Sequence, residues 1–236
     1  MAVEVVYEDH ALLVLNKPSG LLSVPGRGDD KQDCLSARAQ ARYADALVVH
    51  RLDMATSGLM LMARGHAAQR TLSDAFASRN VHKRYVAVVA GELLQIDATA
   101  EAMPNGWAVI DLPIALDWPN RPRRIIDAER GKPSVTRWRV TCGAMGVAGE
   151  PLPAEALIPF DRSAPFTRLE LAPVTGRSHQ LRVHLAALGH PILGDMLYAP
   201  PPLQARASRL LLHASVLVLA HPVTGQPMRF DSKVPF

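Results

Sequence analysis

The stretch Leu47-Val48-Val49-His50-Arg51-Leu52-Asp53-Met54-Ala55-Thr56-Ser57-Gly58-Leu59-Met60-Leu61-Met62 places a polar loop between two apolar segments. The apolar segments have the composition of buried strands. Because burying an unpaired charge is costly, Asp53 needs a cation or hydrogen-bond donors nearby. Asp53 is therefore either a functional carboxylate or the acceptor of an Asx turn with residues 56–58. This segment alone slightly favours the turn.

Further apolar segments on both sides of this stretch are separated by turn signals. We expect strands at residues 3–8, 11–16, 46–50, 59–63, 85–90, 135–140, 168–172 and 211–219. Apolar residues at helical spacing predict helices at 66–79 and 178–188, and weakly at 34–43. Ser178 is the expected N-cap of the second helix, and Gly189 follows its C-terminus. So few helices cannot cover both faces of a parallel sheet, which favours an α+β fold with a mostly antiparallel sheet.

The composition excludes several classes of protein. The 236 residues are 48% hydrophobic and 20% charged, as in a soluble globular protein. The two cysteines, Cys34 and Cys142, form no metal or disulfide pattern, so a reducing, cytoplasmic location is expected. We find no signal peptide, membrane-spanning segment, Walker loop, dinucleotide fingerprint or nucleophile elbow. We therefore expect no metal, no cofactor, no membrane association and, by default, a monomer.

The positive charge is concentrated in one window. The chain has a net charge of +4, yet residues 119–139 alone carry seven basic and two acidic side chains. Such a window is either a phosphate-binding strip or a solvated charged hairpin, and the charge pattern favours neither. Residues 143–165, which include four prolines, read as a surface loop inserted between two strands.

Two further segments carry candidate functional residues. Arg177 precedes the helix expected at 178–188 and Arg182 lies in its first turn, where a cation opposes the helix dipole. This placement suggests an anionic partner, although an ordinary surface arginine is about as consistent with it. Tyr85 opens an apolar strand, where a tyrosine either packs in the core or stacks on a base.

Taken in order, these segments resemble the RluA family of pseudouridine synthases over nearly the whole chain. The resemblance rests on residues 16–26 (NKPSGLLSVPG), 50–58 (HRLDMATSG), 83–85 (KRY), 176–184 (GRSHQLRVH), 187–195 (ALGHPILGD) and 210–214 (LLLHA). Residues 117–122 (DWPNRP) with 131–133 (GKP) resemble one subgroup. That subgroup modifies a hairpin of 23S ribosomal RNA and the anticodon stem-loop of certain tRNAs, and it lacks the N-terminal S4-like domain of other members.

The resemblance implies a single catalytic domain over residues 1–236, with a mixed, mostly antiparallel sheet, a few flanking helices and loops, and a central cleft. It implies that Asp53 is the catalytic nucleophile or base, that Arg182 pairs with it, and that Tyr85 stacks on the uracil and helps to remove the C5 proton. Arg51 would fill the gap left by the flipped nucleotide or clamp its phosphate. The residues expected to bind RNA are His50, Arg51, Arg177, His179, Gln180, Arg121, Arg123, Arg124 and Lys132.

Two other functions are compatible with parts of the sequence. A non-catalytic RNA-binding or RNA-folding protein needs only the basic window, and a hydrolase needs Asp53 with a histidine. The synthase hypothesis is preferred because it accounts for Asp53, Tyr85 and Arg182 together.

Overall fold

The computed structural model describes residues 3–93, 106–143 and 160–236. Contacts group the chain into two compact units, one formed by residues 1–83 with 213–234 and the other by residues 84–212 with 235–236. The chain passes from the first unit to the second within β5 (His82–Ala90) and returns within β11 (Leu212–Ala220). Most of the surface loop expected at residues 143–165 lies outside the described residues.

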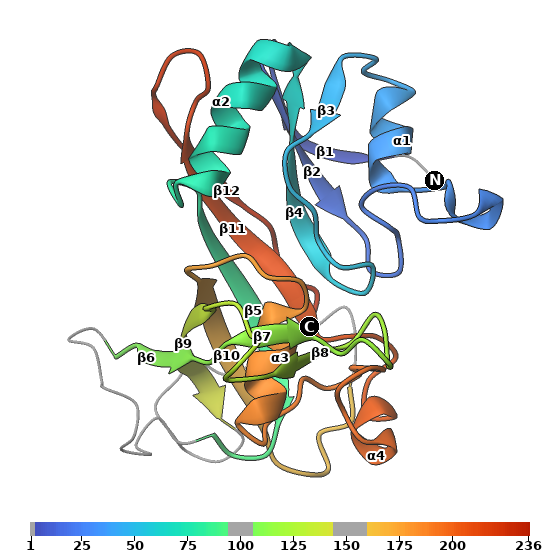
Figure 1. The fold of residues 1–236 in the computed structure, drawn as a ribbon, viewed down its shortest axis with the longest axis vertical. Coiled ribbons are helices and arrows are strands. Elements are labelled where there is room, and N and C mark those ends of the chain that lie inside the picture. The colour runs from blue at the N-terminus through green and yellow to red at the C-terminus, as the bar shows by residue number, and fades with distance from the viewer. Residues whose placement is uncertain (1–2, 94–105, 144–159) are drawn as a thin grey trace. The chain divides into compact units, whose positions relative to one another are not determined.

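The first unit is built on a sheet with the strand order β1-β2-β4-β11-β12, and β3 also pairs with β4. These pairings are antiparallel except that between β4 and β11, which is parallel. Figure 1 shows β1, β2 and β4 side by side. The bounds are β1 (Glu4–Glu8), β2 (Leu12–Lys17), β3 (Ala46–Val48), β4 (Ser57–Arg64) and β12 (Pro227–Asp231).

Helix α2 (Gly65–Ala77) covers this sheet and packs on β3 and β4. Its buried residues Ala68 and Leu72 join the core formed by the alternating apolar side chains of β2, β4 and β11. Helix α1 (Leu35–Gln40) is capped by Cys34, whose Sγ accepts a hydrogen bond from the amide of Ala37. A short 3₁₀ helix spans Asp29–Lys31. The apolar spacing along residues 66–79 therefore predicted the covering helix of this unit.

The second unit contains an antiparallel sheet of order β5-β10-β9-β6 and a separate hairpin, β7-β8. Helix α3 (Gln180–Ala187) packs on β8, β9 and β10, and α4 (Pro201–Gln204) is a single turn. Leu169, Leu171 and Trp138 are buried in the core of this unit. The bounds are β6 (Ala108–Asp111), β7 (Ile114–Leu116), β8 (Arg124–Ile126), β9 (Val135–Gly143) and β10 (Phe166–Pro173).

The α+β class and the mostly antiparallel pairing are confirmed. All eight expected strands are present, and β6, β7, β8 and β12 were not expected. The expected start of α3 at Ser178 was wrong, because His179 adopts a left-handed backbone conformation (φ 58°) and is the N-cap residue. Gly189 follows the helix with φ 82°, and its amide bonds to the carbonyl of Ala186 as expected for a C-terminal glycine. Among the described residues, no helix has both the length and the apolar character needed to cross a membrane.

Candidate active-site residues

Asp53 lies in the loop that connects β3 to β4 in the first unit. The Asp53 side chain is half-buried, whereas the neighbouring Arg51 and Met54 are exposed. The amide of Thr56 donates to the main-chain carbonyl of Asp53 at 3.1 Å, so the turn closes through the backbone. The carboxylate is thus not needed to accept the Thr56 amide, and the alternative roles of Asp53, functional carboxylate or Asx-turn acceptor, stay predictions.

Residues 17–23, which we call the clasp segment, hold the main chain on both sides of Asp53. Ser23 Oγ donates to the carbonyl of Leu52 at 2.7 Å and accepts the Leu52 amide at 3.0 Å. The amide of Gly20 donates to the carbonyl of Met54 at 2.8 Å, and Ser19 Oγ donates to that of Ala55 at 2.7 Å. Separate donors therefore hold the carbonyls of residues 52, 54 and 55, on both sides of Asp53.

Lys17 is the charged centre of the clasp segment. Its side chain is only 1% exposed, and its Nζ donates to the carbonyls of Pro18 (2.9 Å), Leu21 (2.7 Å) and Met54 (3.0 Å). Three acceptors match the three donors of an ammonium group, which makes burial of the charge tolerable. Sequence reasoning treated this segment as a turn and as part of the 16–26 motif, but assigned no role to Lys17. The signal that it missed was a lysine at the end of a strand that begins with four apolar residues.

The other end of the Asp53 loop is bound to β11. Ser57 Oγ and His213 Nδ1 are 2.8 Å apart, and His213 Nε2 lies 3.0 Å from Ser232 Oγ. Gly58 has φ 108° and lies so close to β11 that an added Cβ would be 2.2 Å from the carbonyl oxygen of Ala214. The parallel β4–β11 pairing therefore requires glycine at this position.

His50 makes its contacts within the protein. Its Nε2 accepts the amide of Leu61 at 2.8 Å, and its ring stacks on Phe76 with centroids 4.5 Å apart. Desolvation, together with the nearby positive charge of Lys83, lowers the pKa of His50 to about 3. The imidazole is therefore a neutral acceptor that ties the Asp53 loop to β4. The predicted contact of His50 with RNA stays a prediction.

Arg182 lies in the first turn of α3 and has a partner that the sequence analysis did not name. Its Nε and Nη2 donate to the two carboxylate oxygens of Asp195, at 2.8 and 2.7 Å, and both side chains are buried. Asp195 also accepts the amides of Leu197 and Tyr198. The fork fixes the guanidinium plane, and Nη1 lies outside it. The predicted pairing of Arg182 with Asp53 joins residues of different units and stays a prediction.

Tyr85 is half-buried in β5, opposite Leu171 of β10. This position is compatible with either of the roles considered for it, packing or stacking on a base. Its role in stacking on the uracil therefore stays a prediction.

The remaining candidate residues of the 176–184 motif differ in exposure. Gln180 is buried. Its Oε1 accepts the hydroxyl of Thr175 and the amide of Arg177. Its Nε2 donates to the carbonyl of Val135 and to the hydroxyl of Thr136. Arg177 is exposed. His179 Nδ1 lies 2.7 Å from the hydroxyl of Tyr198, which also accepts the amide of Arg124 at 2.8 Å. Tyr198 therefore links α3 to the β7-β8 hairpin, a role that sequence reasoning did not find.

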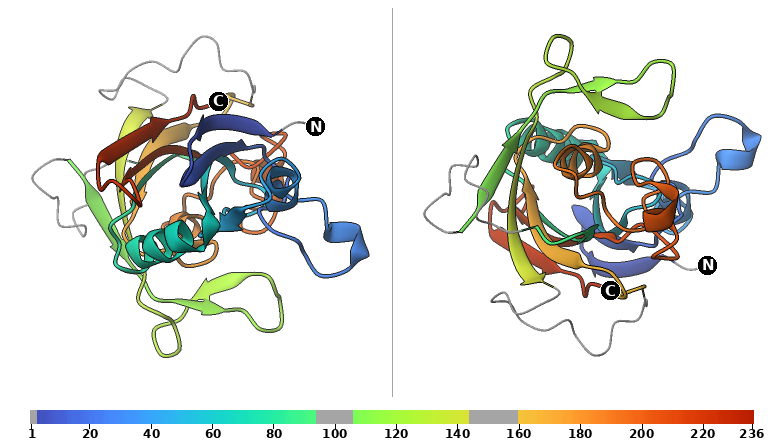
Figure 2. Two further views of the ribbon diagram at one scale, coloured as in Figure 1. Left: turned by 90° about the horizontal axis from the view of Figure 1, so that it is seen from above. Right: turned by 90° about the horizontal axis from the view of Figure 1, so that it is seen from below.

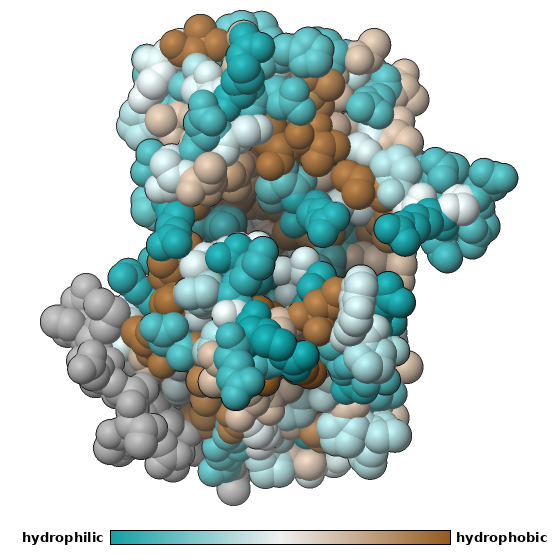
Figure 3. Space-filling model, viewed as in Figure 1, coloured by the Kyte–Doolittle hydropathy of each residue, from teal (hydrophilic) through white to brown (hydrophobic). Residues whose placement is uncertain are grey.

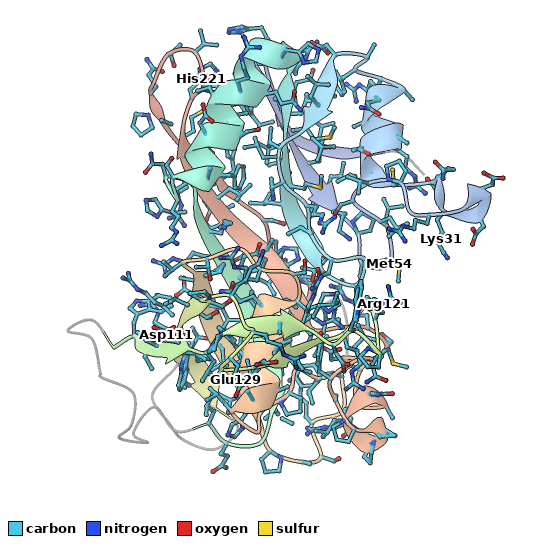
Figure 4. All side chains as sticks on the ribbon, in the orientation of Figure 1. Lys31, Met54, Asp111, Arg121, Glu129 and His221 are labelled. Atoms are coloured by element: carbon cyan, nitrogen blue, oxygen red, sulfur yellow. The ribbon has the colours of Figure 1, made fainter. Side chains whose placement is uncertain are left out.

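The basic window, residues 119–139, covers most of the turn between β7 and β8, strand β8, and the chain from β8 into the first residues of β9. Arg121, Arg123 and Lys132 are exposed, and Arg124 is half-buried. Within the described residues, no carboxylate lies at ion-pair distance from Arg121 or Arg123, whereas Arg130 pairs with Asp127. Hydrophilic side chains gather over this hairpin (Figure 3), and Arg121 and Glu129 lie at its opposite ends (Figure 4). The charges of Arg121 and Arg123 in this turn are therefore not neutralised by a carboxylate of the described residues.

The described residues contain no group of three or more His, Cys, Asp or Glu side chains that could hold a metal ion. The chemistry available to Asp53, Tyr85 and Arg182 is that of a carboxylate, a phenol and a fixed guanidinium. These groups can serve nucleophilic attack, proton transfer and charge stabilisation.

Comparison with known proteins identifies the family. The model of the RNA pseudouridylate synthase family matches residues 11–187. The dual-specificity RNA pseudouridine synthase RluA of Escherichia coli O6:H1 is 45% identical over 98% of this chain and 93% of its own length. The enzyme of the same name from Haemophilus influenzae is 41% identical over 99% of this chain and 94% of its own length.

Solved structures agree with this result. Human RNA pseudouridylate synthase domain containing 1 superposes with a TM-score of 0.71 at 26% identity and covers 99% of this chain and 84% of that one. Human RNA pseudouridylate synthase domain containing 4, at 24% identity and a TM-score of 0.67, covers 98% of this chain and 88% of that one and supports the fold. By the family match and the nearly full-length identity, this chain belongs to the RluA family of RNA pseudouridine synthases, which are isomerases.

Proposed function

We propose that this enzyme isomerises specific uridines in two classes of RNA, hairpins of 23S ribosomal RNA and the anticodon stem-loop of tRNA. The relatives that match nearly the whole chain are named dual-specificity enzymes, and the chain carries the 117–122 and 131–133 motifs of the subgroup that acts on both. We further propose that the enzyme is a monomer, works in the cytoplasm and needs no metal or cofactor.

The reaction needs no external reactant. The bond between ribose C1′ and uracil N1 breaks, the base turns, and C1′ bonds to C5. The proton on C5 is then lost, and N1 gains one. A carboxylate acting on the sugar and a base acting at C5 are sufficient. The target uridine must also leave the stack of the RNA, as substrates of base-modifying enzymes do.

We assign these roles to three residues. Asp53 supplies the carboxylate, as nucleophile or as base. Arg182, its plane fixed by Asp195, offers Nη1 to that carboxylate and orients it. Tyr85 stacks on the uracil and assists removal of the C5 proton.

One observation supports the role of Asp53 most strongly, namely the hydrogen bonds that hold the main chain around it. Hydrogen bonds from the clasp segment fix the backbone on both sides of a half-buried carboxylate. A reaction that depends on the position of one carboxylate gains from such preorganisation. A solvated surface aspartate has no need of it.

The test is Asp53→Asn, which keeps the size of the side chain and removes its charge. We expect release of tritium from C5-labelled uridine in a stem-loop RNA to fall by about a thousandfold or more, with binding of the same RNA largely retained. Asp29→Asn, at an exposed position outside the loop, is the matched control and should behave as wild type. Wild-type turnover by Asp53→Asn would reject the role of Asp53 and favour a protein that acts by binding RNA.

A further inference from the structure

Trp118 is a large apolar side chain that lies exposed to solvent in the described part of the second unit. It is 65% exposed, whereas Trp138 is 5% exposed and Trp107 is half-buried. An exposed indole does not contribute its large apolar surface to the fold. Its position in the turn between β7 and β8, which projects from the sheet in both views of Figure 2, makes it available to a partner.

The turn that carries Trp118 is held together by its own hydrogen bonds. Both carboxylate oxygens of Asp117 accept the side-chain amide of Asn120, at 3.1 and 3.0 Å. The amide of Asp117 donates to the carbonyl of Arg123 at 3.1 Å, and the amide of Arg123 donates to that of Asn120 at 3.0 Å. The loop therefore does not have to become ordered when it binds, which removes an entropic cost of association.

The charges beside Trp118 define the class of partner. The guanidinium carbon of Arg121 lies 4.2 Å from the centroid of the indole, and that of Arg123 lies 5.7 Å from the ring of Tyr198. Asp117, the acidic residue in the segment 117–123, uses its carboxylate within the turn. The turn thus carries one arginine on the exposed indole and a second arginine near it in sequence. Exposed aromatic rings accompanied by cations are used by proteins to bind unpaired nucleotides, with the ring stacking on a base and the cations near the phosphates.

We propose that Trp118 stacks on an unpaired base in the loop of the substrate RNA, while Arg121 and Arg123 hold the adjacent phosphates. An unpaired base is required, because the bases of an A-form helix are stacked and expose no face to an indole. This contact makes Trp118 a residue that distinguishes a stem-loop from a continuous duplex. The proposal rests on the proposed function and adds which part of the RNA the hairpin recognises.

The first experiment compares Trp118→Ala and Trp118→Phe with wild type on a synthetic RNA hairpin that the wild-type enzyme converts. Trp118→Ala should lower kcat/KM by about 5- to 150-fold through KM, with kcat at saturating RNA little changed. Trp118→Phe should retain most of the activity because phenylalanine also stacks. Val223→Ala, at another exposed apolar position, is the control. An unchanged KM for Trp118→Ala would overturn the proposal and point to a protein partner instead.

The second experiment identifies the base. Each loop nucleotide other than the target uridine is replaced, one at a time, by an abasic nucleotide. At one position, the abasic RNA should lower the kcat/KM of the wild-type enzyme by the same factor as Trp118→Ala lowers it on the intact RNA. When the variant is combined with that abasic RNA, the two decreases should not add. Additive losses at every position would overturn the proposal.

Intrinsic fluorescence provides a readout that does not depend on turnover. RNA binding should quench wild type and Trp107→Phe, but quench Trp118→Phe much less. If the wild-type enzyme converted no RNA, the proposed function would fail, and this quenching alone would decide the stacking proposal. Equal quenching of Trp118→Phe and wild type would overturn it.

Discussion

Arg182 illustrates how far one residue could be understood from the sequence alone. Its place at the start of a helix suggested an anionic partner, and the structure contains one, Asp195. The sequence analysis did not name Asp195, because the two residues meet only after the chain has turned at Gly189 and Gly194. An ion pair between residues on different elements leaves no periodic signal in the sequence.

The Arg182–Asp195 pair predicts that Arg182→Met changes stability as well as activity. Removing the cation leaves a fully buried carboxylate, which typically costs about 3–5 kcal/mol. The double variant Arg182→Met/Asp195→Asn should recover much of this stability but none of the turnover. Urea unfolding and tritium release measure the two effects separately. Recovery of turnover in the double variant would contradict the catalytic role of Arg182.

His50 predicts a pH dependence of stability. Because its pKa is about 3 in the folded protein and near 6.5 in the unfolded chain, only the unfolded state binds a proton between these values. The contribution of His50 to the free energy of unfolding is therefore complete above about pH 6.5 and is lost progressively as the pH falls toward 3. His50→Gln, whose amide oxygen can accept the Leu61 amide, should flatten this part of the curve. Urea unfolding of both proteins from pH 7 to pH 4 tests it, and parallel curves would refute it.

At the scale of the elements, the joint between β4 and β11 depends on Gly58. In Gly58→Ala, the new Cβ would clash with the main chain of Ala214, and the positive φ would add strain. We expect a loss of about 3 kcal/mol or more in the free energy of unfolding. Gly225→Ala is the matched control, since Gly225 also has positive φ (71°) but no atom within 4 Å of the added Cβ. Equal losses in the two variants would show that the close approach to β11 contributes nothing.

The elements that could be predicted are those with strong local patterns. β2, β4 and β11 are long apolar runs, and α2 repeats its apolar residues at helical spacing. β7 and β8 have three residues each, too few to show a period of two, and β8 contains an arginine. The start of α3 was misplaced because a left-handed residue at its N-cap has no reliable sequence signal. Short strands and unusual caps are decided by tertiary contacts.

At the scale of the whole molecule, the proposed catalytic residues come from distant parts of the chain. Asp53 belongs to the first unit, and Tyr85 and Arg182 belong to the second. Their shared role was inferred from the order of motifs that resemble a family, because no local physical pattern links them. The clasp segment could have been anticipated as a motif, but its hydrogen bonds to the Asp53 loop required the structure.

The salt dependence of RNA binding tests the charge distribution of the molecule. Each phosphate contact contributes about 0.7 to 0.9 to the slope of log K against log salt. Arg121→Gln/Arg123→Gln should therefore lower the slope by about 1 to 2, because neither residue is neutralised by a carboxylate in the described parts of the chain. Arg130→Gln, whose residue pairs with Asp127, should change it much less. A slope unaffected by the double substitution would exclude the turn as the phosphate-binding part of the hairpin.

The same titrations separate charge from stacking. An indole releases no counterions, so Trp118→Ala should weaken binding by a similar factor at every salt concentration and leave the slope unchanged. We expect Trp118→Ala to lower the affinity but not the slope, and Arg121→Gln/Arg123→Gln to lower the slope. This pair of results would show that one turn recognises both the RNA backbone and a base. If Trp118→Ala lowered the slope as the arginine substitutions do, its effect would be a displacement of Arg121 rather than a lost stack.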